Sequence, residues 1–175
     1  FENPFMGIIV GILFTAVLQS ASASVGILQA LSVTGSISFA AALPITMGIG
    51  VGAACPVLLS SIGTNRNGKR TALIYLLNDL FGMVFWSIVF YSVNAVVHFS
   101  FMDLTMSPVT VALMNSVFRM ATILVLVPFI SKIEKLVFWL IKEDPEDLEE
   151  QADFDLLEER FLAYPALAIT QSHTA

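Results

Sequence analysis

Residues 4–33 have the sequence PFMGIIVGILFTAVL (4–18), QSASAS (19–24) and VGILQALSV (25–33). A polar bend of glutamine and serines therefore separates two apolar segments, each shorter than the roughly 20 residues that a spanning helix needs. Irregular backbone at membrane depth is tolerated only where it lines a cavity inside the protein. The stretch predicts a re-entrant helical hairpin, in which two half-length helices enter and leave the bilayer on the same side.

The composition is that of a membrane protein. Of the 175 residues, 57% are hydrophobic and 13% are charged, whereas soluble domains average roughly 25% charged residues. No charged side chain lies between Glu2 and Arg66, and each charge in hydrocarbon would cost roughly 2.5 to 3.5 kcal/mol. These features exclude an ordinary soluble enzyme, and the absence of a basic stripe with interleaved aromatic residues argues against nucleic-acid binding.

Three further apolar segments follow the hairpin. Residues 37–62 are long enough to cross the bilayer, and their glycines and prolines predict a discontinuous helix. A basic loop at 63–70 follows, and then residues 71–97 and 108–130 predict two ordinary spans joined by a short link. We therefore expect residues 1–142 to form an all-α membrane domain with one hairpin, one broken helix and two transmembrane helices.

Residues 143–175 have a different, acidic composition. Ten of the fourteen acidic residues lie there, with Phe154, Leu157 and Phe161 at helical spacing among them, which predicts the first amphipathic helix of a truncated cytosolic domain. The chain begins with neither a Met nor a basic signal segment. We therefore expect it to be a fragment of a longer protein.

The basic residues predict the orientation. Six of the seven in residues 1–142 lie at 63–70 and 131–142, and none lies in the link 98–107. Because cytoplasmic loops carry the excess of Lys and Arg, both basic segments are expected in the cytoplasm, together with the C-terminal segment. The hairpin mouth, at Asn3 and Gly35, then faces outward. We expect a multi-pass protein of the cell membrane, which in a bacterium is the inner membrane.

The bend contains the first candidate site. Ser20, Ser22 and Ser24 can cap the second half-helix, whose N-terminus offers unpaired N–H groups and a positive dipole end to an anion. Small polar residues also let helices pack closely, so anion binding and packing both remain open at this stage.

The glycine-rich run from Gly48 to Ala53 is the second candidate. Its spacing fits a loose dinucleotide pattern, but that pattern needs a preceding strand and an acidic residue about 20 positions on, where this chain has Leu73. Nucleotide binding is therefore not expected. Backbone that lines a cavity, at Gly50 and Gly52, and glycine-mediated helix packing are the two remaining interpretations.

Asp79 and Arg119 are the ionisable residues well inside the last two predicted spans. Intramembrane charges usually face a protein interior or a partner. Three interpretations remain: a structural ion pair, a role in the transport path, and either snorkelling to the interface or a misplaced span boundary. Asn78 and Asn115 are further pore-facing candidates. No catalytic or metal-binding motif is present, so we expect neither enzymatic activity nor a bound metal or cofactor.

Several segments together resemble the sodium/phosphate cotransporter family, the type II-like group with bacterial members. Gln19-Ser20-Ala21-Ser22-Ala23 is similar to the family's QSSSA motif. Gly26 to Leu31 and Ser61 to Arg70 resemble the second of its two inverted repeats, and Leu156 to Arg160 with Pro165 to Ala168 resemble the start of its PhoU-like domain.

The resemblance implies a secondary transporter whose two inverted repeats meet at a central site for inorganic phosphate, or a similar anion, and sodium. It implies that the site residues here are Gln19, Ser20, Ser22, Ser24, Gly50 and Gly52. The partners would be the bilayer and the missing N-terminal repeat, with sodium as coupling ion. Gly48 to Ala54 stands where the family has Gly-Ala-Asn-Ile-Gly-Thr-Thr, so backbone donors remain but the Asn and Thr side chains do not. A non-transporting anchor that presents the PhoU-like domain, or a transporter of another anion, are the alternatives.

Overall fold

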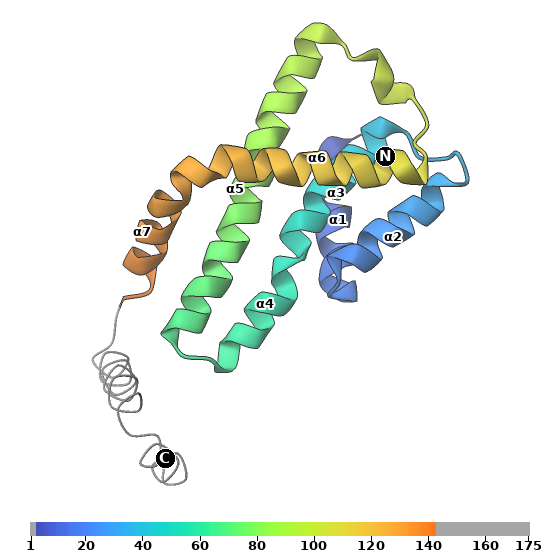
Figure 1. Cartoon of the computed structure of the whole chain (residues 1–175). Coiled ribbons are helices and arrows are strands. Elements are labelled where there is room, and N and C mark those ends of the chain that lie inside the picture. Colours follow the sequence, from blue (N-terminus) through green and yellow to red (C-terminus); the bar gives the residue numbers. More distant parts are fainter. Residues whose placement is uncertain (1–2, 143–175) are drawn as a thin grey trace, which may run out of the picture. The chain divides into compact units, whose positions relative to one another are not determined.

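The computed structural model describes residues 3–142, and every regular element among them is helical (Figure 1). The elements are α1 (Pro4–Leu18), α2 (Ala21–Ser32), α3 (Phe39–Gly52), α4 (Ala54–Ser60), η1 (Ser61–Gly63), α5 (Arg66–Val97), η2 (Ser100–Asp103), α6 (Pro108–Leu126), η3 (Val127–Phe129) and α7 (Ile130–Leu140). The predicted all-α class is confirmed. The acidic helix and the PhoU-like start predicted after residue 142 lie outside the described residues. Contacts divide the chain into two units after Val137, and the description below concerns the first.

Polar caps set where the helices begin. Ser20, Ser38, Asn65 and Ser107 are the N-cap residues of α2, α3, α5 and α6, and each side chain accepts a hydrogen bond from a backbone N–H in the first turn. Such a bond satisfies one of the N–H groups that a helix start leaves unpaired. The cap at Asn65 corrects one prediction: α5 begins at Arg66, so most of the expected basic loop 63–70 belongs to the first turn of this helix.

Glycines let α1 and α3 pack backbone against backbone. A Cβ atom at Gly11 would collide with the carbonyl oxygen of Ile45, and one at Gly48 with that of Ile8. Gly7 lies against Pro44, near the start of α3, and Gly52 lies against Thr15, near the end of α1. The two helices therefore run side by side in the same direction.

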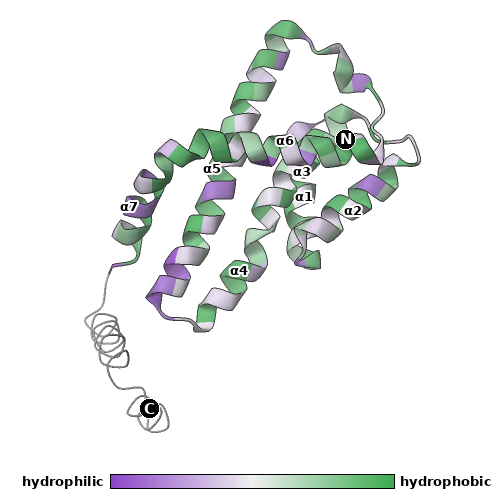
Figure 2. Cartoon of the chain, in the orientation of Figure 1, coloured by the Kyte–Doolittle hydropathy of each residue, from purple (hydrophilic) through white to green (hydrophobic). Residues whose placement is uncertain are grey.

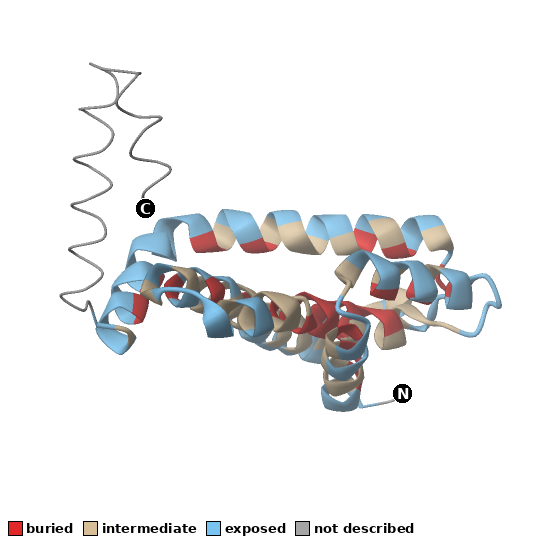
Figure 3. Ribbon diagram, turned by 90° about the horizontal axis from the view of Figure 1, so that it is seen from below, coloured by how far each residue is buried: buried red, intermediate tan, exposed pale blue. Residues whose placement is uncertain are grey.

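α3 is the central helix of the unit. Ten of its fourteen residues are buried, and Figure 3 shows the buried residues gathered around it. α1, α2, α5 and α6 all contact it. α3 ends at Gly52 and α4 begins at Ala54, so the segment 39–63 is divided as predicted, although α3 itself continues through Pro44.

Within residues 3–142, three helical segments are long and apolar enough to cross a membrane: Phe39–Gly63, Arg66–Val97 and Pro108–Leu140. Figure 2 shows apolar residues along these helices and polar residues at the start of α5. The last segment differs from its prediction, since α6 ends at Leu126 rather than Ile130, and Pro128 lies in the short η3 helix that follows. Its ring removes a helical hydrogen bond and interrupts the helix.

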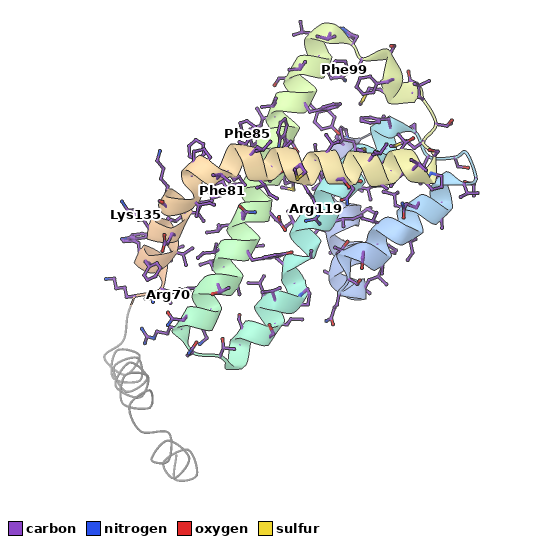
Figure 4. All side chains as sticks on the ribbon, viewed as in Figure 1. Arg70, Phe81, Phe85, Phe99, Arg119 and Lys135 are labelled. Carbon is purple, nitrogen blue, oxygen red and sulfur yellow. The ribbon has the colours of Figure 1, made fainter. Side chains whose placement is uncertain are left out.

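The link between α5 and α6 is attached to the start of α3. Ser38 and Thr105 form an isolated β-bridge. Phe39 packs edge-on against Phe101, with ring centroids 4.9 Å apart, and Phe99 stacks on Phe101 at the same separation. Figure 4 shows Phe99 just beyond the end of α5. The link thereby fixes the start of α6 close to the start of α3.

We predict that Gly48→Ala destabilises the protein by about 1 to 3 kcal/mol, the usual cost of overpacking, because the methyl group would force α1 away from α3. Gly26 is the matched control, since a Cβ there meets nothing within 4 Å. Gly26→Ala should be neutral or stabilising by up to about 1 kcal/mol, because alanine is the better helix former. Thermal unfolding in detergent measures both, and equal stability of the two variants would contradict the packing argument.

Candidate functional site

The polar bend is a tight turn between two helices. Gln19 ends α1 in the left-handed conformation, with φ of 52°, and its N–H donates to the carbonyl oxygen of Thr15. Ser20 then caps α2, its Oγ accepting from the N–H of Ala23 at 3.2 Å. The N–H groups of Ala21 and Ser22 lie in the first turn of α2, where no intrahelical acceptor exists. The turn therefore presents unpaired donors at the positive end of a helix dipole.

The predicted serines have different roles at this turn. Ser24 is buried; its hydroxyl donates to the carbonyl oxygen of Ser20 at 3.0 Å and accepts from Oγ1 of Thr15 at 2.9 Å. Both partners are internal, so Ser24 holds α2 against α1. Ser22 is exposed and Ser20 half-buried, and their Oγ atoms lie 3.2 Å apart. These two hydroxyls, with the exposed Gln19 amide, are the groups available to a ligand.

A second polar site lies between α3, α5 and α6. It is a cavity of about 170 Å³ that brings together four residues predicted from the sequence: Gly50, Asn78, Asp79 and Arg119. Thr46, Met47, Tyr75, Phe118, Thr122 and Ile123 complete its lining. Asn115 is not among the lining residues. The two threonines were missed in the sequence, although Thr46 lies one turn before Gly50 and Thr122 one turn after Arg119, on the same helix faces.

A close helix crossing positions the two charges in this cavity. A Cβ atom at Gly82 would collide with the side chain of Thr122, so α5 and α6 approach closely there. Asp79 and Arg119 each lie three residues before a member of this contact, Asp79 before Gly82 and Arg119 before Thr122, and both line the cavity. Figure 4 shows where Arg119 lies on α6. Oδ2 of Asp79 is buried without a hydrogen-bond partner among the described residues, which is costly in a medium of low dielectric constant.

The glycine run divides between packing and cavity. Gly48 and Gly52 face α1, and a Cβ at Gly52 would lie 2.6 Å from the carbonyl oxygen of Ile12. Gly50 has nothing within 4 Å of its Cβ position and lines the polar cavity. Gly48 and Gly52 therefore lie on the face of α3 that packs against α1, whereas Gly50 lines the polar cavity.

A larger cavity of about 540 Å³ lies between the hairpin and α3. Ser24, Thr34, Ser36, Ser38 and Asp103 are its polar lining residues, among apolar side chains of α1, α2 and α3. It shares no lining residue with the cavity around Asp79.

Within residues 3–142, no group of three or more His, Cys, Asp or Glu side chains is placed to hold a metal ion.

We predict that Ser24→Ala lowers the free energy of unfolding by about 1 to 3 kcal/mol, because it leaves the buried Thr15 hydroxyl without its acceptor. The double variant Thr15→Val with Ser24→Ala should recover part of this loss, since no buried donor is then unpaired. Ser22→Ala, at an exposed position, is the control and should leave stability unchanged. Thermal unfolding of the four proteins checks this, and a double variant less stable than Ser24→Ala would refute it.

Comparison with known proteins identifies the family. The family model described as Na+/Pi-cotransporter matches residues 1–130, which include the hairpin, the divided helix and the helices that line the polar cavity. No curated protein and no solved structure matches the chain. The resemblance inferred from the sequence is confirmed at the level of the family: the chain belongs to the Na+/Pi-cotransporter family.

Proposed function

We propose that this chain is part of a sodium-dependent transporter of inorganic phosphate, in which the hairpin tip lines one half of the anion site. The family match supports sodium and phosphate as the transported pair. The observation that carries the site is the tip itself: Ser20 and Ser22 hold two hydroxyls 3.2 Å apart at the N-terminus of α2. Hydroxyls, backbone N–H groups and a helix dipole together are a favourable environment for a phosphate.

The packing of α1 against α3 supports a re-entrant hairpin. α1 has 15 residues and α2 has 12, so neither reaches the roughly 20 residues that a span needs. Thr15, one turn before the tip, contacts Gly52, near the middle of the 25-residue segment Phe39–Gly63. A tip at this level lies near the bilayer midplane, beside the division between α3 and α4. The mouth then faces outward, and the basic segments and the C-terminal segment are cytoplasmic.

Residues 1–142 supply one of two inverted halves in this proposal. Labelled-phosphate uptake by proteoliposomes of the intact transporter, with and without sodium, is the direct test. We expect uptake that requires sodium, and none with the 175-residue chain alone, because half of the site would be missing. If folded intact protein shows no sodium-dependent uptake, the alternative function of a non-transporting membrane anchor is favoured. The absence of the family's Asn and Thr side chains between Gly48 and Ala54 also favours that alternative.

We predict that Ser20→Ala and Ser22→Ala each weaken anion binding by about 1 to 3 kcal/mol, the cost of leaving hydrogen-bonding groups unpaired. Calorimetry on the intact transporter with inorganic phosphate gives the affinity. Ser36→Ala is the control, since Ser36 is exposed and lies beyond the end of α2. Unchanged affinity in both tip variants would mean that these serines serve only to shape the turn.

We also propose that Asp79 and Arg119 compensate each other's charge within the polar cavity. They share the cavity, and the buried Oδ2 of Asp79 has no hydrogen-bond donor among the described residues. Arg119 supplies the opposite charge that this carboxylate needs. The pair then holds α5 and α6 in register next to Gly50, where the family sequence differs from this chain.

Asp79→Asn and Arg119→Asn should each destabilise the protein by about 3 to 5 kcal/mol, because a buried charge loses its partner. The double variant should regain most of this stability, since neither charge then remains. A double-mutant cycle of thermal unfolding in detergent measures the coupling. If the two losses simply add, the residues do not interact, and Arg119 becomes a candidate for direct anion contact.

A further inference from the structure

A groove at the bend between α6 and α7 has no part in the proposed transport site. It is a cavity of about 320 Å³ lined by residues from α5, α6, η3 and α7: Phe81, Phe85, Val125, Leu126, Phe129, Lys132, Ile133 and Leu136. Seven of these eight side chains are apolar and one is a cation. Figure 4 shows Phe81 and Phe85 on α5, near the bend.

The bend falls where a membrane span is complete. α6 and η3 together run from Pro108 to Phe129, which already satisfies the roughly 20 residues of a span. α7 then begins, with Ile133 and Val137 buried and charged residues on its exposed side. An amphipathic helix directly after a completed span is expected to lie in the interface between hydrocarbon and headgroups. The groove therefore opens at the boundary between acyl chains and headgroups.

Lys132 supplies the charge at this boundary. Its ammonium lies 5.2 Å from the centroid of the Phe129 ring, and within residues 3–142 it makes no hydrogen bond or ion pair with a carboxylate. Lys135 lies one turn further along the same helix, and Arg66, Lys69 and Arg70 form a second basic cluster. By the distribution of basic residues, this is the cytoplasmic side, where anionic lipids attract basic segments.

We propose that this groove binds an acyl chain of an anionic phospholipid, with Lys132 contacting the phosphate of its headgroup. A water-soluble anion would find no polar side chain in the lining other than Lys132, whereas an acyl chain is matched by the seven apolar ones. Phe81, Phe129 and Leu136 are 43%, 46% and 38% exposed, so their apolar surface is open to lipid. The proposal does not depend on which solute is transported.

Native mass spectrometry of the intact protein tests this, with dioleoylphosphatidylglycerol and dioleoylphosphatidylcholine as the probes. We expect one phosphatidylglycerol to be retained, and about fivefold weaker retention in Lys132→Gln, the usual effect of losing one direct hydrogen bond to the headgroup phosphate. Val125→Trp, which fills the groove, should abolish retention. Lys135→Gln and Val117→Trp are the matched controls, since neither residue lines the groove, and both should retain lipid as the unmodified protein does.

Retention of phosphatidylglycerol by Lys132→Gln at the unmodified level would overturn the proposal. Equal retention of phosphatidylcholine would overturn it too, because the groove would then hold ordinary boundary lipid. An equal loss in Lys135→Gln would show a diffuse charge effect and no site. Should Val125→Trp fail to fold, Lys132→Gln, which introduces a smaller side chain at an exposed position, still decides the question.

Discussion

The close approach of α1 and α3 is the constraint on which the rest of the fold depends. Backbone carbonyl oxygens occupy the places where side chains at Gly11 and Gly48 would lie. In lipid no hydrophobic effect drives helices together, and van der Waals contact between their backbones does so instead. Small residues such as these glycines allow that close contact. This packing fixes the level of the hairpin tip against the divided helix, and it leaves the opposite face of α3 free to contact α5 and α6.

Much of the fold was predictable because hydrophobic length and polar interruptions are local signals. The bend at Gln19, the division near Ala53 and the two long helices all followed from them. Helix ends were less predictable. Asn65 caps α5 within an expected loop, and α6 ends before Pro128. Capping residues and prolines determine a helix end to within one turn, whereas the mean hydropathy of a segment does not locate its ends so closely.

The candidate site was predictable in its residue types but not in its grouping. Gly50, Asp79 and Arg119 come from three helices and meet because Gly82 lets α6 approach α5, a contact between positions 40 residues apart that no spacing rule reports. Ser24 appeared equivalent to Ser20 and Ser22 in the sequence. Its burial beside Thr15 gives it a different task, and only the three-dimensional packing of α1 and α2 distinguishes it.

In a re-entrant hairpin, α1 and α2 enter and leave the membrane on the same side, with the tip between them. Single-cysteine accessibility in oriented vesicles tests it most directly, using Asn3→Cys and Ser36→Cys in a Cys55→Ser background, with Thr64→Cys as the reference for the other side. For a re-entrant hairpin, we expect an impermeant thiol reagent to label the first two cysteines from one side and the third from the opposite side. Labelling of residues 3 and 36 from opposite sides would contradict it.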